Sequence, residues 1–213
     1  MSQTHLLQQI SRKGANIAML SAKIAGDSNA LSVVLDGLSA KPAAIKYGCA
    51  RVLLEHSKTH PEDIYPHVQI FIDMLADENK IVQAEGTLVL SHLAVVDTDG
   101  RIDDIIERYL APIPGPTLMA AANAIKGAAK IVTARPHLAD WVATEILKVE
   151  KAVYKTEECR NIALGQAVLT FDCIFDLVTD KKALLTFMRR QLDNPRSATR
   201  KKAEKALKKR QSA

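Results

Sequence analysis

Apolar residues recur at intervals of three and four along five stretches of the chain, the spacing of one face of an α-helix. Each stretch ends in a short polar turn, and a second helical stretch with small residues near its centre follows. The pattern predicts five pairs of packed helices. The five first helices read ALSVVLDGL (30–38), IYPHVQIFIDML (64–75), IDDIIERYL (102–110), LADWVATEIL (138–147) and ALLTFMRRQL (183–192).

The pairs share a common sequence pattern. A residue that closes the first helix, such as Leu38 or Leu75, is followed seven positions later by an aliphatic or β-branched anchor, then by a long or basic residue. Successive anchors are 37, 36, 41 and 40 residues apart, and two of the five copies are weaker. One helix pair cannot bury its own apolar face, so such units must stack. The anchors are Ile45, Val82, Leu118, Cys159 and Thr199.

These units resemble HEAT repeats, in which the turn often carries Asp and the second helix opens with Val-Arg and a small residue. Asp77 and Asp193 match the turn Asp, and Arg160 and Arg200 match the Arg. The resemblance covers roughly residues 28 to 210, and the ankyrin and tetratricopeptide periods fit less well. Lys46 is a near match to the Arg, whereas Gln83 and Met119 depart from it.

The resemblance implies an all-α, right-handed α-solenoid of about five HEAT-like hairpins in one repeat domain, 1–213. Two short helices broken at KGAN precede the hairpins and form an N-terminal cap. The predicted boundaries are 1–27 for the cap and 28–60, 61–98, 99–135, 136–180 and 181–213 for the repeats.

The composition fits close-packed helices, because aromatic residues make up only 4% of the chain and Ala, Leu, Val and Ile fill the apolar positions. We expect the single tryptophan, Trp141, to lie in the core or at a seam between repeats. The cysteines Cys49, Cys159 and Cys173 lack metal-ligand spacing and lie among helical apolar residues, so we expect reduced core thiols.

The polar start of the chain and the absence of a long apolar run predict an intracellular protein without a membrane span. We expect it in the cytoplasm, and a nuclear location stays open.

Few residues have the spacing that catalysis or metal binding requires. His56 and His60 are four apart, but no carboxylate lies at ligand spacing, and we expect solvent-facing groups at a helix end. His92 is expected to be hydrogen-bonded or half-exposed in a second helix. Asp97 and Asp99 are expected to cap a helix that begins near Arg101. We therefore predict no enzyme activity, no metal and no cofactor.

Alkylpurine DNA glycosylases are HEAT-like proteins of similar length that use aromatic residues and an Asp in a basic groove. Asp140 and Trp141 are adjacent here, but they lie in a first helix, and a single Trp leaves no stacking partner for an extruded nucleotide. This alternative is the weakest of those considered.

Positive charge is concentrated at the C-terminus. Residues 189–213 hold ten basic and two acidic residues, and this net of +8, against +5 for the whole chain, leaves −3 for the remainder. On a helical wheel, one stripe holds Thr199, Ala203, Ala206 and Leu207, and four lysines lie opposite, which indicates a helix rather than a tail. The predicted basic patch comprises Arg189, Arg190, Arg196, Lys201, Lys202, Lys205, Lys208, Lys209 and Arg210.

Two functions remain open from the sequence. The first is a non-catalytic scaffold that binds a protein, such as an acidic or extended segment, in a groove lined by the second helices. The second is sequence-independent nucleic-acid binding through the basic C-terminal helix, which equally suits a solubilising cap. The predicted groove row, which opens the second helices at equivalent positions and also suits structural contacts, comprises Lys46, Gln83, Met119, Arg160 and Arg200.

Overall fold

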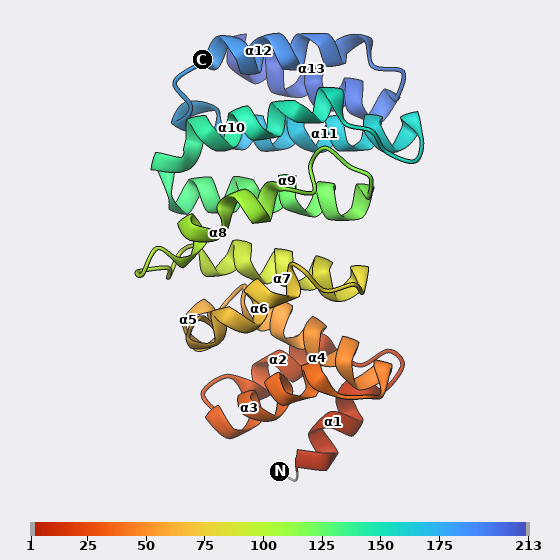
Figure 1. Cartoon of the computed structure of the whole chain (residues 1–213), viewed down its shortest axis with the longest axis vertical. Helices are drawn as coiled ribbons and strands as arrows, with labels where there is room; N and C mark the ends of the chain where they lie inside the picture. The colour runs from red at the N-terminus through yellow and green to blue at the C-terminus, as the bar shows by residue number, and fades with distance from the viewer. Residues whose placement is uncertain (1–2, 212–213) are drawn as a thin grey trace. The chain divides into compact units, whose positions relative to one another are not determined.

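The computed structural model describes residues 3–211, which form helices joined by short turns and contain no strand (Figure 1). The chain divides into two compact units, and the boundary lies between Thr98 and Asp99. We call them the N-terminal unit and the C-terminal unit. The boundary falls where the sequence predicts the end of one repeat, 61–98, and the start of the next.

The N-terminal unit starts with two short helices that are separated where the sequence predicts a break. Gly14 there has a φ of 77°, and the side chain of Asn16 caps the second helix. Helix pairs follow, and α4 packs against both α2 and α7. The elements are α1 (Gln3–Ser11), α2 (Ile17–Ile24), α3 (Ser28–Asp36), η1 (Gly37–Ser39), α4 (Ala43–His56), α5 (Pro61–Ile64), η2 (Tyr65–His67), α6 (Val68–Met74) and α7 (Lys80–Leu93).

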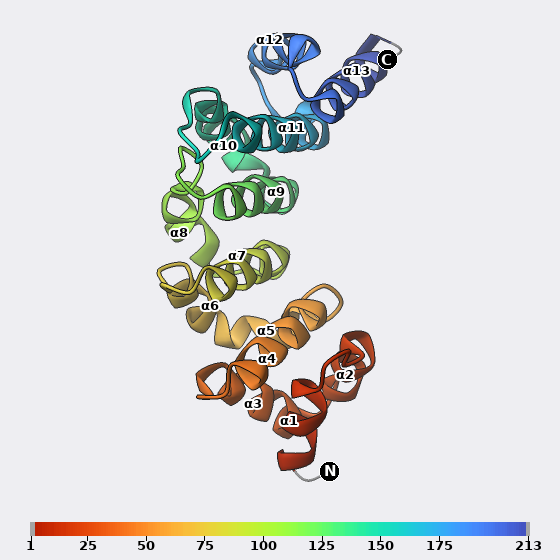
Figure 2. The same cartoon turned by 90° about the vertical axis from the view of Figure 1, so that its right-hand side faces the viewer.

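The C-terminal unit consists of three helix pairs. Figure 2 shows its second helices, α9, α11 and α13, on one side of the unit and its first helices, α8, α10 and α12, on the other. The middle second helix, α11, packs against both α9 and α13. The elements are α8 (Arg101–Leu110), α9 (Leu118–Ala134), η3 (Pro136–Leu138), α10 (Ala139–Leu147), η4 (Lys148–Lys151), α11 (Glu157–Ile174), η5 (Phe175–Leu177), α12 (Lys181–Arg190), η6 (Gln191–Asp193) and α13 (Ser197–Gln211).

Local sequence explains where these helices begin. Asp27 accepts a hydrogen bond from the backbone N–H of Ala30 at 3.0 Å, and Thr156 accepts one from that of Cys159 at 3.2 Å. Such caps satisfy amide groups that the first helical turn leaves without partners. α8 begins at Arg101, as predicted, directly after Gly100, whose φ of 75° lies in the left-handed region.

Small residues in the second helices let neighbouring elements approach closely. A Cβ atom on Gly48 would lie 2.7 Å from the carbonyl oxygen of Ile10, and one on Gly165 would lie 2.6 Å from Oγ1 of Thr199. Larger side chains would therefore push apart α1 and α4 at the first site and α11 and α13 at the second. The small residues in the sequence thus mark positions where two helices pack closely.

Candidate functional site

The first two members of the predicted groove row contact turns. The ammonium group of Lys46 lies 3.9 Å from a carboxylate oxygen of Asp77, in the turn of the next pair. Gln83 donates a hydrogen bond from Nε2 to the carbonyl oxygen of Leu75 at 2.8 Å, at the end of the preceding first helix. These contacts help to hold the turns of the N-terminal unit in place.

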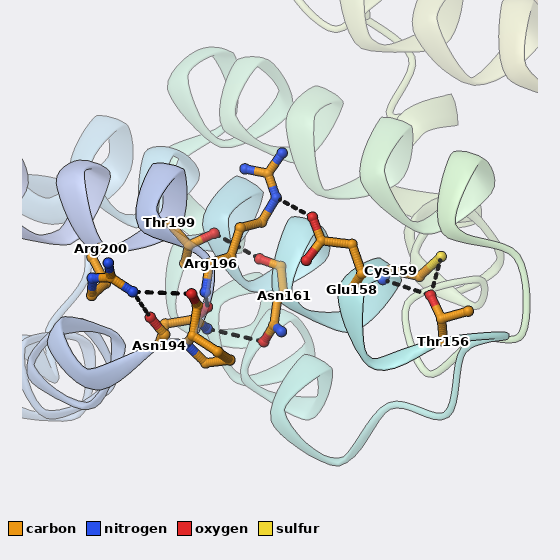
Figure 3. A network of polar contacts seen from close by, with 9 residues as sticks. Thr156, Glu158, Cys159, Asn161, Asn194, Arg196, Thr199 and Arg200 are labelled. Atoms are coloured by element: carbon orange, nitrogen blue, oxygen red, sulfur yellow. Dashed lines mark hydrogen bonds and ion pairs between the residues drawn. The ribbon is translucent and has the colours of Figure 1, made fainter.

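Arg200 makes the same kind of contact in the C-terminal unit. Its Nη1 donates to the carbonyl oxygens of Asn194 at 2.7 Å and Pro195 at 3.0 Å, in the turn just before its own helix (Figure 3). Arg160 is half-buried, and its side chain has no hydrogen-bond or ion-pair partner within the described part of the chain. Met119 is 42% exposed on α9. Within the described part of each unit, no hydrogen bond or ion pair joins two side chains of the row.

A buried polar network fixes the turn before α13. Asn194 donates from Nδ2 to the side-chain oxygen of Asn161 at 3.2 Å, and Thr199 donates to the carbonyl oxygen of Asn161 at 2.8 Å (Figure 3). Asn194 Nδ2 also donates to the side-chain oxygen of Gln191 at 3.0 Å. Because buried polar groups are costly when unpaired, these bonds specify how α13 sits on α11.

Three arginines of the basic patch bind acidic residues of the preceding pair. Arg196 Nε lies 2.8 Å from Glu158 Oε1 (Figure 3), and Arg190 binds both carboxylate oxygens of Glu150. Arg210 donates from Nη2 to the side chain of Asp172 at 2.6 Å. The partners in these pairs are 38 or 40 residues apart, so the arginines link successive repeats.

The end of α13 is held by further contacts. The guanidinium group of Arg210 lies 4.4 Å from the centre of the Phe175 ring, a distance suited to a cation–π contact. Lys209 Nζ lies 3.6 Å from the Asp172 carboxylate. The helical stripe predicted for α13 is also present. Thr199, Ala203 and Ala206 are buried and Leu207 is half-buried, whereas Lys201, Lys205, Lys208 and Lys209 are exposed.

Three other cations of α13 have no ion-pair partner within the described residues, 3–211. They are Lys201, Lys202 and Lys205. Partial burial and then the positive charge of Arg196 lower the pKa of the Lys202 ammonium group. On α12, Arg189 is exposed. The predicted basic patch therefore contains two kinds of cation, those that join repeats and those that face solvent.

An exposed stripe runs along each second helix of the C-terminal unit. On α9 and α11 its residues are spaced by three, four or seven positions, which places them on one side of each helix, and on α13 it includes the adjacent Lys201 and Lys202 and then Lys205. Figure 2 shows these second helices on the side of the unit opposite the first helices. We call this surface the second-helix face. It comprises Met119, Lys126, Lys130 and Thr133 on α9, Ile162, Gln166, Leu169 and Cys173 on α11, and Lys201, Lys202 and Lys205 on α13.

The second-helix face has exposed apolar groups at its centre. Leu169 on α11 is 44% exposed, and Ile162, seven positions earlier, is half-buried. The acidic groups of α11 nearest to this stripe are occupied, because Glu158 binds Arg196 and Asp172 binds Arg210. This surface was not predicted from the sequence, although α9 gives a signal for it, since that helix contains two lysines and no acidic residue.

The histidines of the N-terminal unit differ from the prediction. His56 is 0% exposed, with Nδ1 3.4 Å from Ser21 Oγ and Nε2 2.9 Å from Asp63 Oδ2, and its ring stacks on that of His60. The expected solvent-facing position is wrong, because partners from α2 and α5 enclose the ring. The prediction for His92 is confirmed, since it is buried and its Nδ1 lies 2.8 Å from the Ser57 hydroxyl.

Two other expectations about burial are contradicted in part. Trp141 is 37% exposed on α10 and is not a core residue, and its expected place at a seam between repeats stays a prediction. All three cysteines are free thiols, but only Cys49 is buried, whereas Cys159 is half-buried and Cys173 is exposed. The apolar spacing marks these positions as helical but does not identify the neighbouring elements that would bury them.

Asp140, the carboxylate considered for base excision, is hydrogen-bonded to a turn. Its side chain accepts hydrogen bonds from the backbone N–H of Thr179 at 2.6 Å and from the Thr179 hydroxyl at 2.7 Å. The first and then the second of these bonds lower the pKa of the Asp140 carboxyl. This residue joins α10 to the turn before α12.

The described residues contain no group of three or more His, Cys, Asp or Glu side chains placed to hold a metal ion. Within residues 3–211, no helix combines the length and apolar character needed to cross a membrane.

No family model and no curated protein matches the sequence. Solved structures do match over nearly the whole chain. An engineered protein has 17% identity and a TM-score of 0.59, and the match covers 99% of this chain and 89% of that one. A designed armadillo repeat protein in complex with the peptide (KR)4 has 14% identity and a TM-score of 0.61, with coverages of 98% and 99%.

A second designed armadillo repeat protein has 13% identity and a TM-score of 0.52, with 97% of this chain and 99% of that chain covered. These likenesses establish the fold. The predicted all-α solenoid of the armadillo and HEAT type is confirmed. The partition into a cap and five repeats stays a prediction.

Proposed function

We propose that the protein is a non-catalytic scaffold that binds another protein on the second-helix face of the C-terminal unit. Armadillo-like solenoids use the surface of stacked helices as an extended binding surface. The observation that carries the proposal is the exposure of Leu169 and Met119 on this face, next to lysines from α9 and α13. Exposed apolar side chains that are surrounded by charged residues are typical of a protein-binding surface.

The groove row predicted from the sequence contributes less to this proposal. Lys46, Gln83 and Arg200 hold turns, so their side chains are already engaged. Of the five residues in the row, Met119 belongs to the second-helix face. We therefore place recognition on the solvent-facing stripe of the second helices rather than at their first turns.

The absence of catalysis is part of the proposal. Ser21, His56 and Asp63 do form a series of hydroxyl, imidazole and carboxylate. However, Ser21 and His56 are buried, so a substrate could not reach the Ser21 hydroxyl. The series instead links α2, α4 and α5, which makes it a structural element.

Site-specific crosslinking tests the proposed function. A photo-reactive residue in place of Leu169 should capture a partner protein, and the same residue in place of Thr144, which is exposed on α10, should not. The captured protein, once purified, should bind the unmodified chain and lose affinity for Leu169→Asp but not for Thr144→Asp. Equal capture from both positions, or equal affinity of both variants, would contradict the proposal.

Nucleic-acid binding by the C-terminal helix is less well supported. Arg190, Arg196 and Arg210 bind carboxylates, and Arg200 binds backbone carbonyl groups, so these side chains are not free to neutralise phosphates. The glycosylase alternative is weaker still, because Asp140 is occupied by Thr179.

A further inference from the structure

Charge on the second-helix face is arranged in rows, one on each helix. The α9 row contains Lys126 and Lys130, and α9 has no acidic residue along its 17 positions. Both lysines are exposed, and Lys126 has no ion-pair partner within residues 3–211. This side of the face is therefore cationic.

The α13 row is cationic as well. Lys201 and Lys205 are exposed and Lys202 is half-buried, and none of the three has an acidic partner in the described chain. The one acidic residue of α13, Glu204, is exposed and lies about 60° around the helix from Lys201 and about 100° from Lys205. Neither Lys202 nor Lys205 has an acidic residue three or four positions away on α13, so no carboxylate of the same helix lies beside them.

The α11 row, between the two lysine rows, is apolar and neutral. It presents Leu169 and Ile162, and its neighbouring carboxylates are held by Arg196 and Arg210. Packed helix axes are about 8–10 Å apart, so each lysine row lies within side-chain reach of a ligand placed over α11. The face has an apolar centre with positive charge on both sides.

Resting on the proposed function, we propose that this face binds a segment of another protein in which an aliphatic side chain is flanked by aspartate or glutamate residues. The aliphatic group packs on Leu169, and the carboxylates bind Lys126 of α9 on one side and the lysines of α13 on the other. Because phosphate backbones gain nothing from an apolar centre, the arrangement favours an acidic peptide over nucleic acid. A basic peptide would meet like charge on both sides.

Selection from a peptide library tests this chemistry. Phage that display random peptides of about 12 residues, which span roughly 40 Å when extended, are panned on the full-length protein. We expect the enriched peptides to contain aspartate or glutamate on either side of leucine, isoleucine or another large apolar residue. Enrichment of neutral or basic peptides would overturn the inference, whereas the proposed function would still be supported by crosslinking at position 169.

Two triple variants with equal loss of charge then locate the binding site. For an enriched acidic peptide, Lys126→Gln, Lys202→Gln and Lys205→Gln together should raise Kd at least about tenfold at physiological salt. The control combines Lys151→Gln, Lys182→Gln and Arg189→Gln, at exposed positions on the first-helix side, and should leave Kd unchanged. Equal Kd values for the two variants would overturn the inference.

Duplex DNA is the competing ligand. If DNA of arbitrary sequence binds at physiological salt, displaces the peptide and loses affinity in the Lys126, Lys202 and Lys205 variant, the face recognises phosphate and the inference is wrong. Retention of peptide binding in the presence of excess DNA supports it. Loss of capture at position 169 would instead contradict the proposed function itself.

Discussion

The guanidinium group of Arg190 binds both carboxylate oxygens of Glu150, with Nε 2.8 Å from Oε1 and Nη2 2.7 Å from Oε2. The two residues are 40 positions apart and join the ends of two successive first-helix segments. Arg190, which the clustering of basic residues in the sequence places in a basic patch, thus connects two repeats. The distinction between such cations and the unpaired lysines leads to separate expectations for stability and for binding.

Removing this pair should lower stability by a small amount. We expect Arg190→Gln to reduce the free energy of unfolding by about 0.5–1 kcal/mol, because the pair is bidentate but partly exposed to solvent. Chemical denaturation of Arg190→Gln, Glu150→Gln and the double variant measures the coupling. If the losses of unfolding free energy in the two single variants add up to that of the double variant, the ion pair contributes nothing to stability.

Close approach of α11 and α13 should make Gly165 sensitive to a single methyl group. Gly165→Ala should cost about 1–3 kcal/mol of stability, because the new Cβ would overlap Thr199 Oγ1, although alanine favours helix by about 1 kcal/mol. Thermal and denaturant unfolding measure the change. In a Thr199→Ala background the same substitution should cost less, and an equal cost in both backgrounds would place the strain elsewhere.

Burial of Cys49 should make stability fall at high pH. Burial raises the pKa of its thiol from 9.0 to about 12, so the folded protein keeps the proton in a range where the unfolded chain loses it. This contribution to stability is complete below pH 9 and is lost progressively as the pH rises from 9 toward 12. The difference in unfolding free energy between the parent protein and Cys49→Ala should change over this window and stay constant below it.

The same burial predicts selective alkylation. In the folded protein, iodoacetamide should modify the exposed Cys173 rapidly and Cys49 only after unfolding. Peptide mass spectrometry distinguishes the sites. Rapid modification of Cys49 under native conditions would contradict the packing of α4.

His56 should matter more for stability than its neighbour His60. His56→Leu removes the hydrogen-bond partner of buried Ser21, and we expect a loss of about 2–4 kcal/mol. His60→Ala, which removes the stacked ring, should cost about 0.5–1.5 kcal/mol. Equal losses for the two variants would argue against a structural role for the buried contacts of His56.

The fold could be predicted because its main determinants are local. The apolar spacing of each helix, the anchor period and the stripe on Thr199 and Ala203 all depend on residues close in sequence, and the helices lie where this pattern indicates. Small residues such as Gly165 also gave a correct signal, since they occur where second helices meet.

The site was harder to predict because it depends on which contacts form between repeats. His56 is buried by Ser21, which is 35 residues away, and Arg190 is neutralised by Glu150, which is 40 residues away. A helical wheel does not give these partners. The absence of acidic residues in α9 was visible in the sequence, but its meaning required knowledge of the side on which Leu169 is exposed.

A lysine-reactivity footprint tests most directly whether a protein partner binds the second-helix face. The full-length protein is acetylated under limiting conditions with and without the partner captured at position 169, and the rate at each lysine is measured by mass spectrometry. The account predicts that modification of Lys126 and Lys205 slows severalfold on binding, whereas Lys151 and Lys182 react at unchanged rates. Protection of Lys151 and Lys182 with no change at Lys126 and Lys205 would contradict it.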